Sequence, residues 1–67
     1  MISKYRKQNN MSQADLAIKL NVSQQLVSLY EKGKRQPPID ILIKLSDLFG
    51  CTIDELVRGE KNDKISN

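Results

Sequence analysis

Two adjacent glutamines, Gln24 and Gln25, stand in the middle of this 67-residue chain and directly follow Ser23. A glutamine side-chain amide offers a donor and an acceptor side by side, which matches N6 and N7 of adenine in a DNA major groove. Taken alone, the two glutamines are more simply explained as solvent-facing helix residues. They become candidate base-contacting residues only if the fold places them at the projecting start of a helix.

One helical turn further on, Ser28 and Leu29 extend the same candidate surface. Ser28 could reach a base or a phosphate, and it could equally be a solvated serine. Leu29 is expected to be largely exposed, because Val27 and Tyr30 take the core side of the helix. Such a leucine can pack on a thymine methyl group, although a single exposed leucine is also ordinary on a protein surface.

Basic residues are concentrated in the first half of the chain. The net charge is +5 over residues 1–35 and −2 over residues 36–67, which together give +3. This asymmetry suggests that one end faces a polyanion, although scattered solvated lysines would give the same totals. Lys34 and Arg35 follow the glutamine-bearing segment, where they could contact phosphates or simply form a solvated loop.

The elements that would position these residues are predicted to be five short helices, because five apolar stripes recur at helical spacing. Capping and breaking residues bound each stripe. The predicted starts are Ile2, the residues after Ser12 and Ser23, Ile39, and the residue after Thr52; the predicted ends are Asn9-Asn10, Asn21, Gly33, Gly50 and Gly59. No strand pattern is present. We therefore predict a compact all-α domain over residues 1–59, followed by a short flexible tail over 60–67.

The second and third predicted helices are separated only by residues 21–23, and so short a link forces a sharp angle between them. Ala17 is small where the two helices should cross, and Val22 should fill the turn. This is the arrangement of a helix-turn-helix over residues 12–32. In such a motif the segment Ser23–Lys32 would be the helix that enters a major groove.

The order and spacing of these motifs resemble the Cro/C1-type (XRE) family of phage and bacterial repressors, over residues 2–58. The resemblance rests on Met11–Ala17, Asn21–Gln25 and Tyr30–Pro37, and it continues through Leu42, Leu45, Phe49, Gly50 and Ile53–Leu56. It implies a five-helix, lambda-repressor-like DNA-binding domain that is usually dimeric and regulates transcription. Asn21 stands where the family usually has glycine, a mild change because asparagine also adopts positive φ.

The resemblance also implies roles for single residues. Gln13 is similar to the family's phosphate-contacting glutamine, and Ser23 caps the third helix, whose N-terminus favours anions. Arg6 and Glu31 would form a partly buried salt bridge between the first and third helices. The dimer surface would lie at the end of the fourth helix and on the fifth, where the apolar candidates are Ile41, Leu48, Ile53 and Val57.

Several functional classes are disfavoured by composition. There is no histidine and Cys51 is the single cysteine, so neither a disulfide within the chain nor a structural zinc site is expected. Adjacent Asp54 and Glu55 point apart on a helix and form no catalytic pair. We therefore expect no enzyme activity, no cofactor, no metal and no small-molecule ligand. With no membrane-length apolar run and no signal peptide, we expect a soluble, cytoplasmic protein.

These patterns predict a sequence-specific regulator of transcription, a repressor that binds double-stranded DNA as a symmetric homodimer. The alternative is a protein-interaction module that has the same fold without DNA binding, such as an antitoxin or anti-repressor, because fold alone does not fix function. The basic loop and the glutamines at the helix start favour DNA binding, since a protein adapter needs neither.

Overall fold

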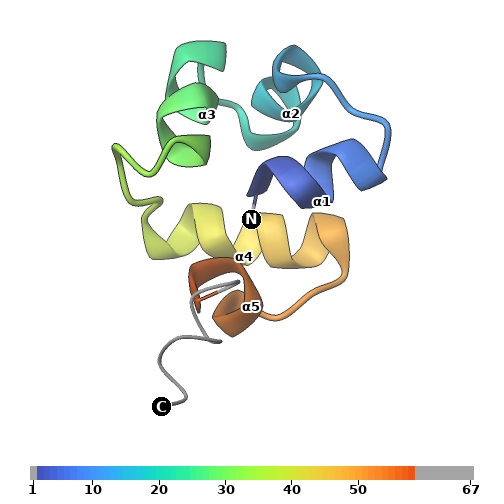
Figure 1. Cartoon of the computed structure of the whole chain (residues 1–67), viewed down its shortest axis with the longest axis vertical. Coiled ribbons are helices and arrows are strands. Elements are labelled where there is room, and N and C mark those ends of the chain that lie inside the picture. The colour runs from blue at the N-terminus through green and yellow to red at the C-terminus, as the bar shows by residue number, and fades with distance from the viewer. Residues whose placement is uncertain (1, 59–67) are drawn as a thin grey trace.

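The computed structural model describes residues 2–58, and all of the regular secondary structure in that range is α-helical. The helices are α1 (Ile2–Gln8), α2 (Gln13–Leu20), α3 (Gln24–Glu31), α4 (Ile39–Phe49) and α5 (Ile53–Arg58). The predicted all-α, five-helix fold is confirmed. Gly59 and the predicted tail lie outside the described residues. In Figure 1, α2 and α3 occupy one end of the long axis, α5 lies toward the other end, and α4 crosses between them.

One apolar core joins the helices. Leu16, Leu20, Val27 and Leu45 are almost completely shielded from solvent, and around them lie the other residues of the core cluster, Ile2, Ala17, Tyr30, Ile41, Leu42 and Leu56. Burial of one such side chain contributes roughly 1.5–3 kcal/mol. The four central residues come from α2, α3 and α4, so the helix-turn-helix pair is held in place by the helix beneath it.

The turn between α2 and α3 depends on a left-handed residue. Asn21 has φ 60° and ψ 44°, as its place after α2 predicted. Asparagine adopts this conformation more readily than most residues, because its short polar side chain tolerates positive φ. The N–H of Val22 then donates to the carbonyl oxygen of Ala17 at 3.0 Å, and its side chain packs against the core. The chain therefore turns sharply between α2 and α3 within three residues.

Side-chain caps define where α2 and α3 begin. Ser12 Oγ accepts the N–H of Asp15 at 3.0 Å, and the Asp15 carboxylate accepts the N–H of Ser12 at 3.0 Å. These hydrogen bonds hold the pKa of Asp15 below its usual range. Ser23 Oγ accepts the N–H of Leu26 at 3.1 Å. Both predicted N-caps are confirmed, and each satisfies a backbone donor that would otherwise be free.

Within residues 2–58, no helix has the length and apolar character to cross a bilayer.

Candidate nucleic-acid interface

The start of α3 lies at the free end of the molecule, at the top of Figure 1 and opposite α5. Val27 and Tyr30 are buried and fix one side of α3 to the core. Gln24 and Gln25 are both exposed in its first turn, where no neighbouring element covers them. The structure therefore places the two glutamines together on a projecting helix end, the position from which a helix reaches base edges in the major groove.

The second turn of α3 is less exposed than predicted. Ser28 and Leu29 are both partly buried, and the expectation that Leu29 is largely exposed was wrong. The following loop folds back onto this turn: the N–H groups of Lys34 and Arg35 both donate to the carbonyl oxygen of Leu29, at 3.0 and 3.3 Å. Leu29 is nevertheless not among the residues that pack against the core cluster. Base contacts by Ser28 and Leu29 remain predictions.

The loop after α3 presents its two basic side chains to solvent. α3 ends at Glu31, one residue before the predicted last residue Lys32, which is its C-cap. Gly33 follows with φ 74°, as expected for the residue that stops the helix. Lys34 and Arg35 are exposed. Neither makes an ion pair with any carboxylate of residues 2–58. Their backbone is anchored to α3 while their side chains are free, so both can reach an anion beside that helix.

Arg6 and Glu31 form the predicted bridge between α1 and α3. Arg6 Nε donates to Glu31 Oε2 at 2.7 Å and Arg6 Nη2 donates to Oε1 at 3.3 Å, with the two side chains only 12% and 8% exposed. Arg6 Nη1 also donates to the carbonyl oxygen of Met11 at 2.8 Å. One guanidinium therefore connects α1, the end of α3 and the segment that leads into α2.

The charge state of Glu31 follows from this environment. Burial raises its pKa. The hydrogen bonds from Arg6 and Gln13 and the charge of Arg6 lower the pKa by a larger amount, so the net shift is downward. The hydrogen bond to Glu31 raises the pKa of Arg6. Both groups are therefore ionised at neutral pH. The pKa of Glu31 is lower in the folded state than in the unfolded state. The contribution of ionised Glu31 to stability is therefore present at neutral pH and is lost as the pH falls through its folded-state pKa.

Gln13 takes part in the same network, which the sequence did not predict. Its Nε2 donates to Glu31 Oε1 at 3.0 Å, and its side chain is partly buried. Gln13 was expected only as a phosphate contact at the start of α2. The two residues lie 18 positions apart, so no local spacing indicates the bond. The fold brings them together because α2 and α3 pack side by side.

Comparison with known proteins identifies the family. A family model described as helix-turn-helix matches residues 2–56. The chain belongs to the XRE family of helix-turn-helix proteins. As a member of the XRE family, it carries a helix-turn-helix DNA-binding domain of the kind found in transcriptional regulators.

Three relatives illustrate the range of this family. The chain is 34% identical over 64 residues to the uncharacterized HTH-type transcriptional regulator YqaE of Bacillus subtilis. The matched region covers 96% of this chain and 55% of YqaE. The chain is 40% identical over 52 residues to an uncharacterized HTH-type transcriptional regulator of Methanocaldococcus jannaschii, covering 78% and 79%. It is 44% identical over 53 residues to multiprotein-bridging factor 1c of Arabidopsis thaliana, covering 79% and 36%. No solved structure gives a significant match.

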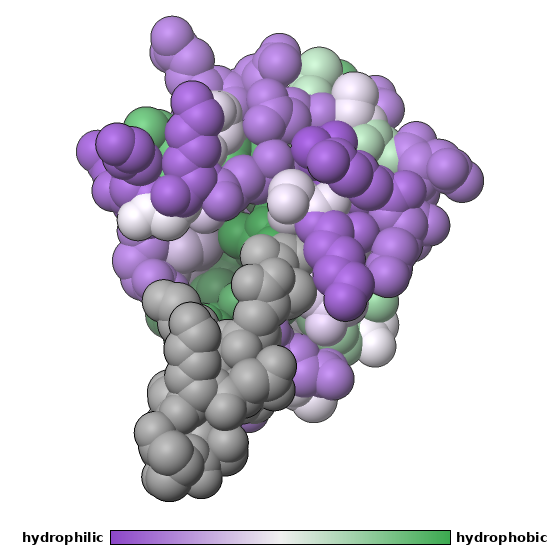
Figure 2. Space-filling view, in the orientation of Figure 1, coloured by the Kyte–Doolittle hydropathy of each residue, from purple (hydrophilic) through white to green (hydrophobic). Residues whose placement is uncertain are grey.

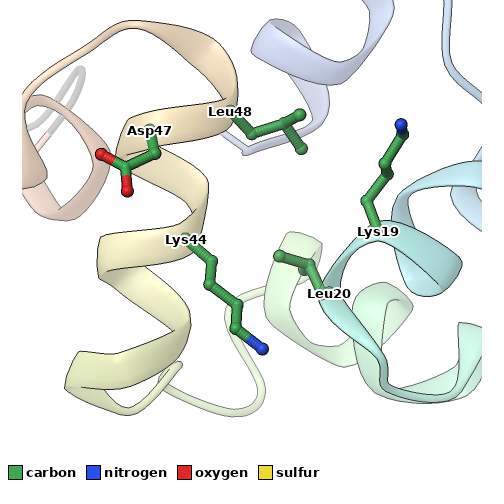
Figure 3. A pocket seen from close by; sticks show the side chains of 5 residues that line it. All are labelled: Lys19, Leu20, Lys44, Asp47 and Leu48. Atoms are coloured by element: carbon green, nitrogen blue, oxygen red, sulfur yellow. The ribbon is translucent and has the colours of Figure 1, made fainter.

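A groove between α2 and α4 is separate from the predicted DNA contacts of this XRE domain. Its volume is about 390 Å³, and it is lined by Lys19, Leu20, Lys44, Asp47 and Leu48. Figure 3 shows the two leucines facing the gap from opposite helices, with the side chain of Lys44 reaching along it toward α2. None of the predicted base or phosphate contacts lines the groove, so it is not part of the candidate interface.

The surface over the helix-turn-helix pair is hydrophilic: in Figure 2 polar and charged residues cover most of the face above α2 and α3.

The apolar residues that were predicted to form a dimer surface differ in their exposure. Val57 is 47% exposed, Leu48 and Ile53 are partly buried against the core, and Ile41 is 6% exposed. The expectation that Ile41 offers an outward apolar group was wrong, because it lies one helical turn before the buried Leu45 on the same face of α4.

Proposed function

We propose that this XRE-family chain is a sequence-specific regulator of transcription and that the start of α3 enters the major groove of duplex DNA. The observation that supports the proposal most directly is the exposure of Gln24 and Gln25 at the free end of α3, next to the buried anchors Val27 and Tyr30. Each amide can hydrogen-bond N6 and N7 of an adenine. Ser28 and Leu29 would extend the base contacts along the same helix.

Phosphate contacts would flank this helix on both sides. Gln13 and Ser23 stand at the starts of α2 and α3, where free backbone N–H groups attract anions. Lys34 and Arg35 are exposed in the loop just after α3. Together they would hold the backbone of the DNA on either side of the groove and fix the depth at which α3 enters. Such contacts position a protein on DNA without reading its sequence.

Binding to a random duplex is expected to weaken steeply as salt is added, because each neutralised phosphate contributes about −0.9 to the slope of log K against log salt. Arg35→Ala should make this slope shallower by about one unit and should weaken binding to all sequences alike. Electrophoretic mobility shift across a salt series measures both effects. Lys44→Ala, in the groove between α2 and α4, is the control and should leave the slope unchanged. An unchanged slope for Arg35→Ala would remove that residue from the interface.

We also propose that the active form is a symmetric homodimer that acts as a repressor. One α3 contacts too few base pairs to select a site in a genome, whereas two copies related by a two-fold axis double the contacts. The two helices would then enter successive major grooves about 34 Å apart. Such a complex would cover the DNA to which polymerase must bind. With such a target we propose a cytoplasmic location, where a cell without a nucleus keeps its DNA.

Sedimentation with and without a selected duplex tests the dimer. We expect two chains on one duplex, and an association in free solution that is weaker than on DNA, because α5 is short and offers little area for pairing. A duplex cut to a single half-site serves as the control and should bind one chain. One chain on a full-length operator that lacks any repeat would contradict the dimer.

A second candidate function is a protein-interaction module. It is favoured by the similarity to a protein named a multiprotein-bridging factor, which shares 44% identity over 53 residues with this chain. The mobility-shift experiment separates the two functions. A DNA-binding domain retards random duplex at low salt and releases it at high salt, whereas a protein adapter that does not bind DNA retards it at neither.

A further inference from the structure

A hydrogen bond connects the start of α2 to the end of α3, at the edge of the proposed DNA interface. Gln13 Nε2 donates to Glu31 Oε1 at 3.0 Å. The amide nitrogen of glutamine carries two hydrogens, so this bond uses one of them. Within residues 2–58 the Gln13 side chain makes no other hydrogen bond. Its second N–H therefore stays available to an acceptor outside the chain.

The acceptor for this bond is itself held rigidly. Both oxygens of Glu31 receive hydrogen bonds from Arg6, at 2.7 and 3.3 Å, and the Glu31 side chain is 8% exposed. The same guanidinium binds the carbonyl oxygen of Met11 at 2.8 Å, just before α2 begins. The first turn of α2 is thus fixed twice, through the backbone before Ser12 and through the side chain of Gln13.

A carboxylate also determines which way the Gln13 amide faces. Ionised Glu31 can only accept hydrogen bonds, so it draws the amide nitrogen toward itself and keeps the amide oxygen turned away. A phosphate oxygen likewise only accepts. An unrestrained amide could present its oxygen to a phosphate, which would be repulsive, whereas an amide held by Glu31 keeps a donor near the N-terminus of α2.

We propose that Glu31 is a positioning residue for DNA binding, which acts through Gln13 by holding its amide so that the second N–H meets a DNA phosphate. This inference rests on the proposed DNA-binding function. A side chain that is already ordered loses less rotamer freedom when the complex forms, and a hydrogen bond to a charged acceptor is among the stronger kinds. The salt bridge with Arg6 would then affect DNA affinity as well as stability.

Two variants separate positioning from stability. Glu31→Gln keeps an oxygen that can accept from Gln13 but leaves the Arg6 charge uncompensated, so it should be less stable. The double variant Arg6→Met, Glu31→Leu removes both buried charges and should be more stable than Glu31→Gln, but it removes the acceptor for Gln13. Affinity for duplex DNA is measured at a temperature at which circular dichroism shows every variant to be folded.

We expect the affinity and the stability to rank in opposite order. Glu31→Gln should bind within about twofold of the original chain, and the double variant should bind about tenfold more weakly, as for the loss of one hydrogen bond to a charged group. Gln13→Ala should cost about tenfold in the original chain but only about twofold in the double variant, because the amide is no longer held there. The salt slope should not change in the double variant or on Gln13→Ala, since the double variant loses one charge of each sign and Gln13 is neutral.

Each outcome decides the matter. An affinity that follows stability, or an equal cost of Gln13→Ala in both backgrounds, would show that the salt bridge is purely structural and would overturn the inference while leaving DNA binding intact. If Gln13→Ala costs nothing in either background, Gln13 makes no phosphate contact and the inference fails. If the original chain binds no duplex at any salt concentration, the proposed function fails first and the inference falls with it.

Discussion

Replacing Glu31 with alanine is expected to lower the free energy of unfolding by roughly 3–5 kcal/mol. The Arg6 side chain is only 12% exposed, and the substitution removes its counter-ion. Desolvating an ion costs several kcal/mol in a protein interior, and the remaining hydrogen bond to the Met11 carbonyl oxygen does not replace the lost opposite charge. The loss would also free the amide of Gln13 and loosen the contact between α1 and α3.

Urea denaturation followed by circular dichroism measures this change. Asp47→Ala is the matched control, because Asp47 is an exposed acid that makes no ion pair within residues 2–58, and its effect should stay within about 0.5 kcal/mol. The double variant Arg6→Met, Glu31→Leu should recover part of the loss, since a buried ion pair can often be replaced by apolar side chains. A denaturation midpoint unaffected by Glu31→Ala would contradict the buried bridge.

The Gln24→Ala and Gln25→Ala variants are each expected to lose roughly 1–3 kcal/mol of binding free energy on the preferred DNA site. This corresponds to between about fivefold and about 150-fold in affinity. Each amide would otherwise contribute a donor and an acceptor to one base pair, and the alanine variant leaves that base unread. Affinity for random duplex should hardly change, because phosphate contacts dominate non-specific binding.

Competition binding between the preferred site and random duplex gives the specificity ratio directly. Gln8→Ala is the control: this glutamine is also exposed, but it lies at the end of α1 and is not among the proposed DNA contacts. It should leave both affinities as they are. Full specificity in both the Gln24 and the Gln25 variants would mean that α3 is not the helix that reads the bases.

The boundaries of the helix-turn-helix could be predicted because the signals that set them are local. Ser12 and Ser23 cap the helix that follows each of them within a few residues, and Asn21 adopts positive φ by virtue of its own side chain. The Arg6–Glu31 bridge was also predicted, but from the family resemblance. Spacing alone could not have paired residues 25 positions apart.

The features that were missed all depend on contacts that reach beyond a single helix. Leu29 faces away from the core by helical periodicity, yet the loop after α3 returns to hydrogen-bond its backbone and reduces its exposure. Ile41 looked surplus to a small core, but α4 buries it together with Leu42 and Leu45. The bond between Gln13 and Glu31 requires both the bridge to Arg6 and the packing of α2 against α3. Periodicity describes one helix at a time and carries no information on these arrangements.

Selection of bound duplexes from a random pool tests the central proposal, that α3 reads DNA sequence in a symmetric dimer, most directly. We predict enrichment of a pseudo-palindrome, with two related half-sites whose centres lie one turn of B-DNA apart, about 34 Å. Adenines should recur at the positions that face Gln24 and Gln25. Recovery of a single site without an inverted repeat would contradict the dimer, and a recovered pool with no enriched sequence would contradict sequence reading by α3 altogether.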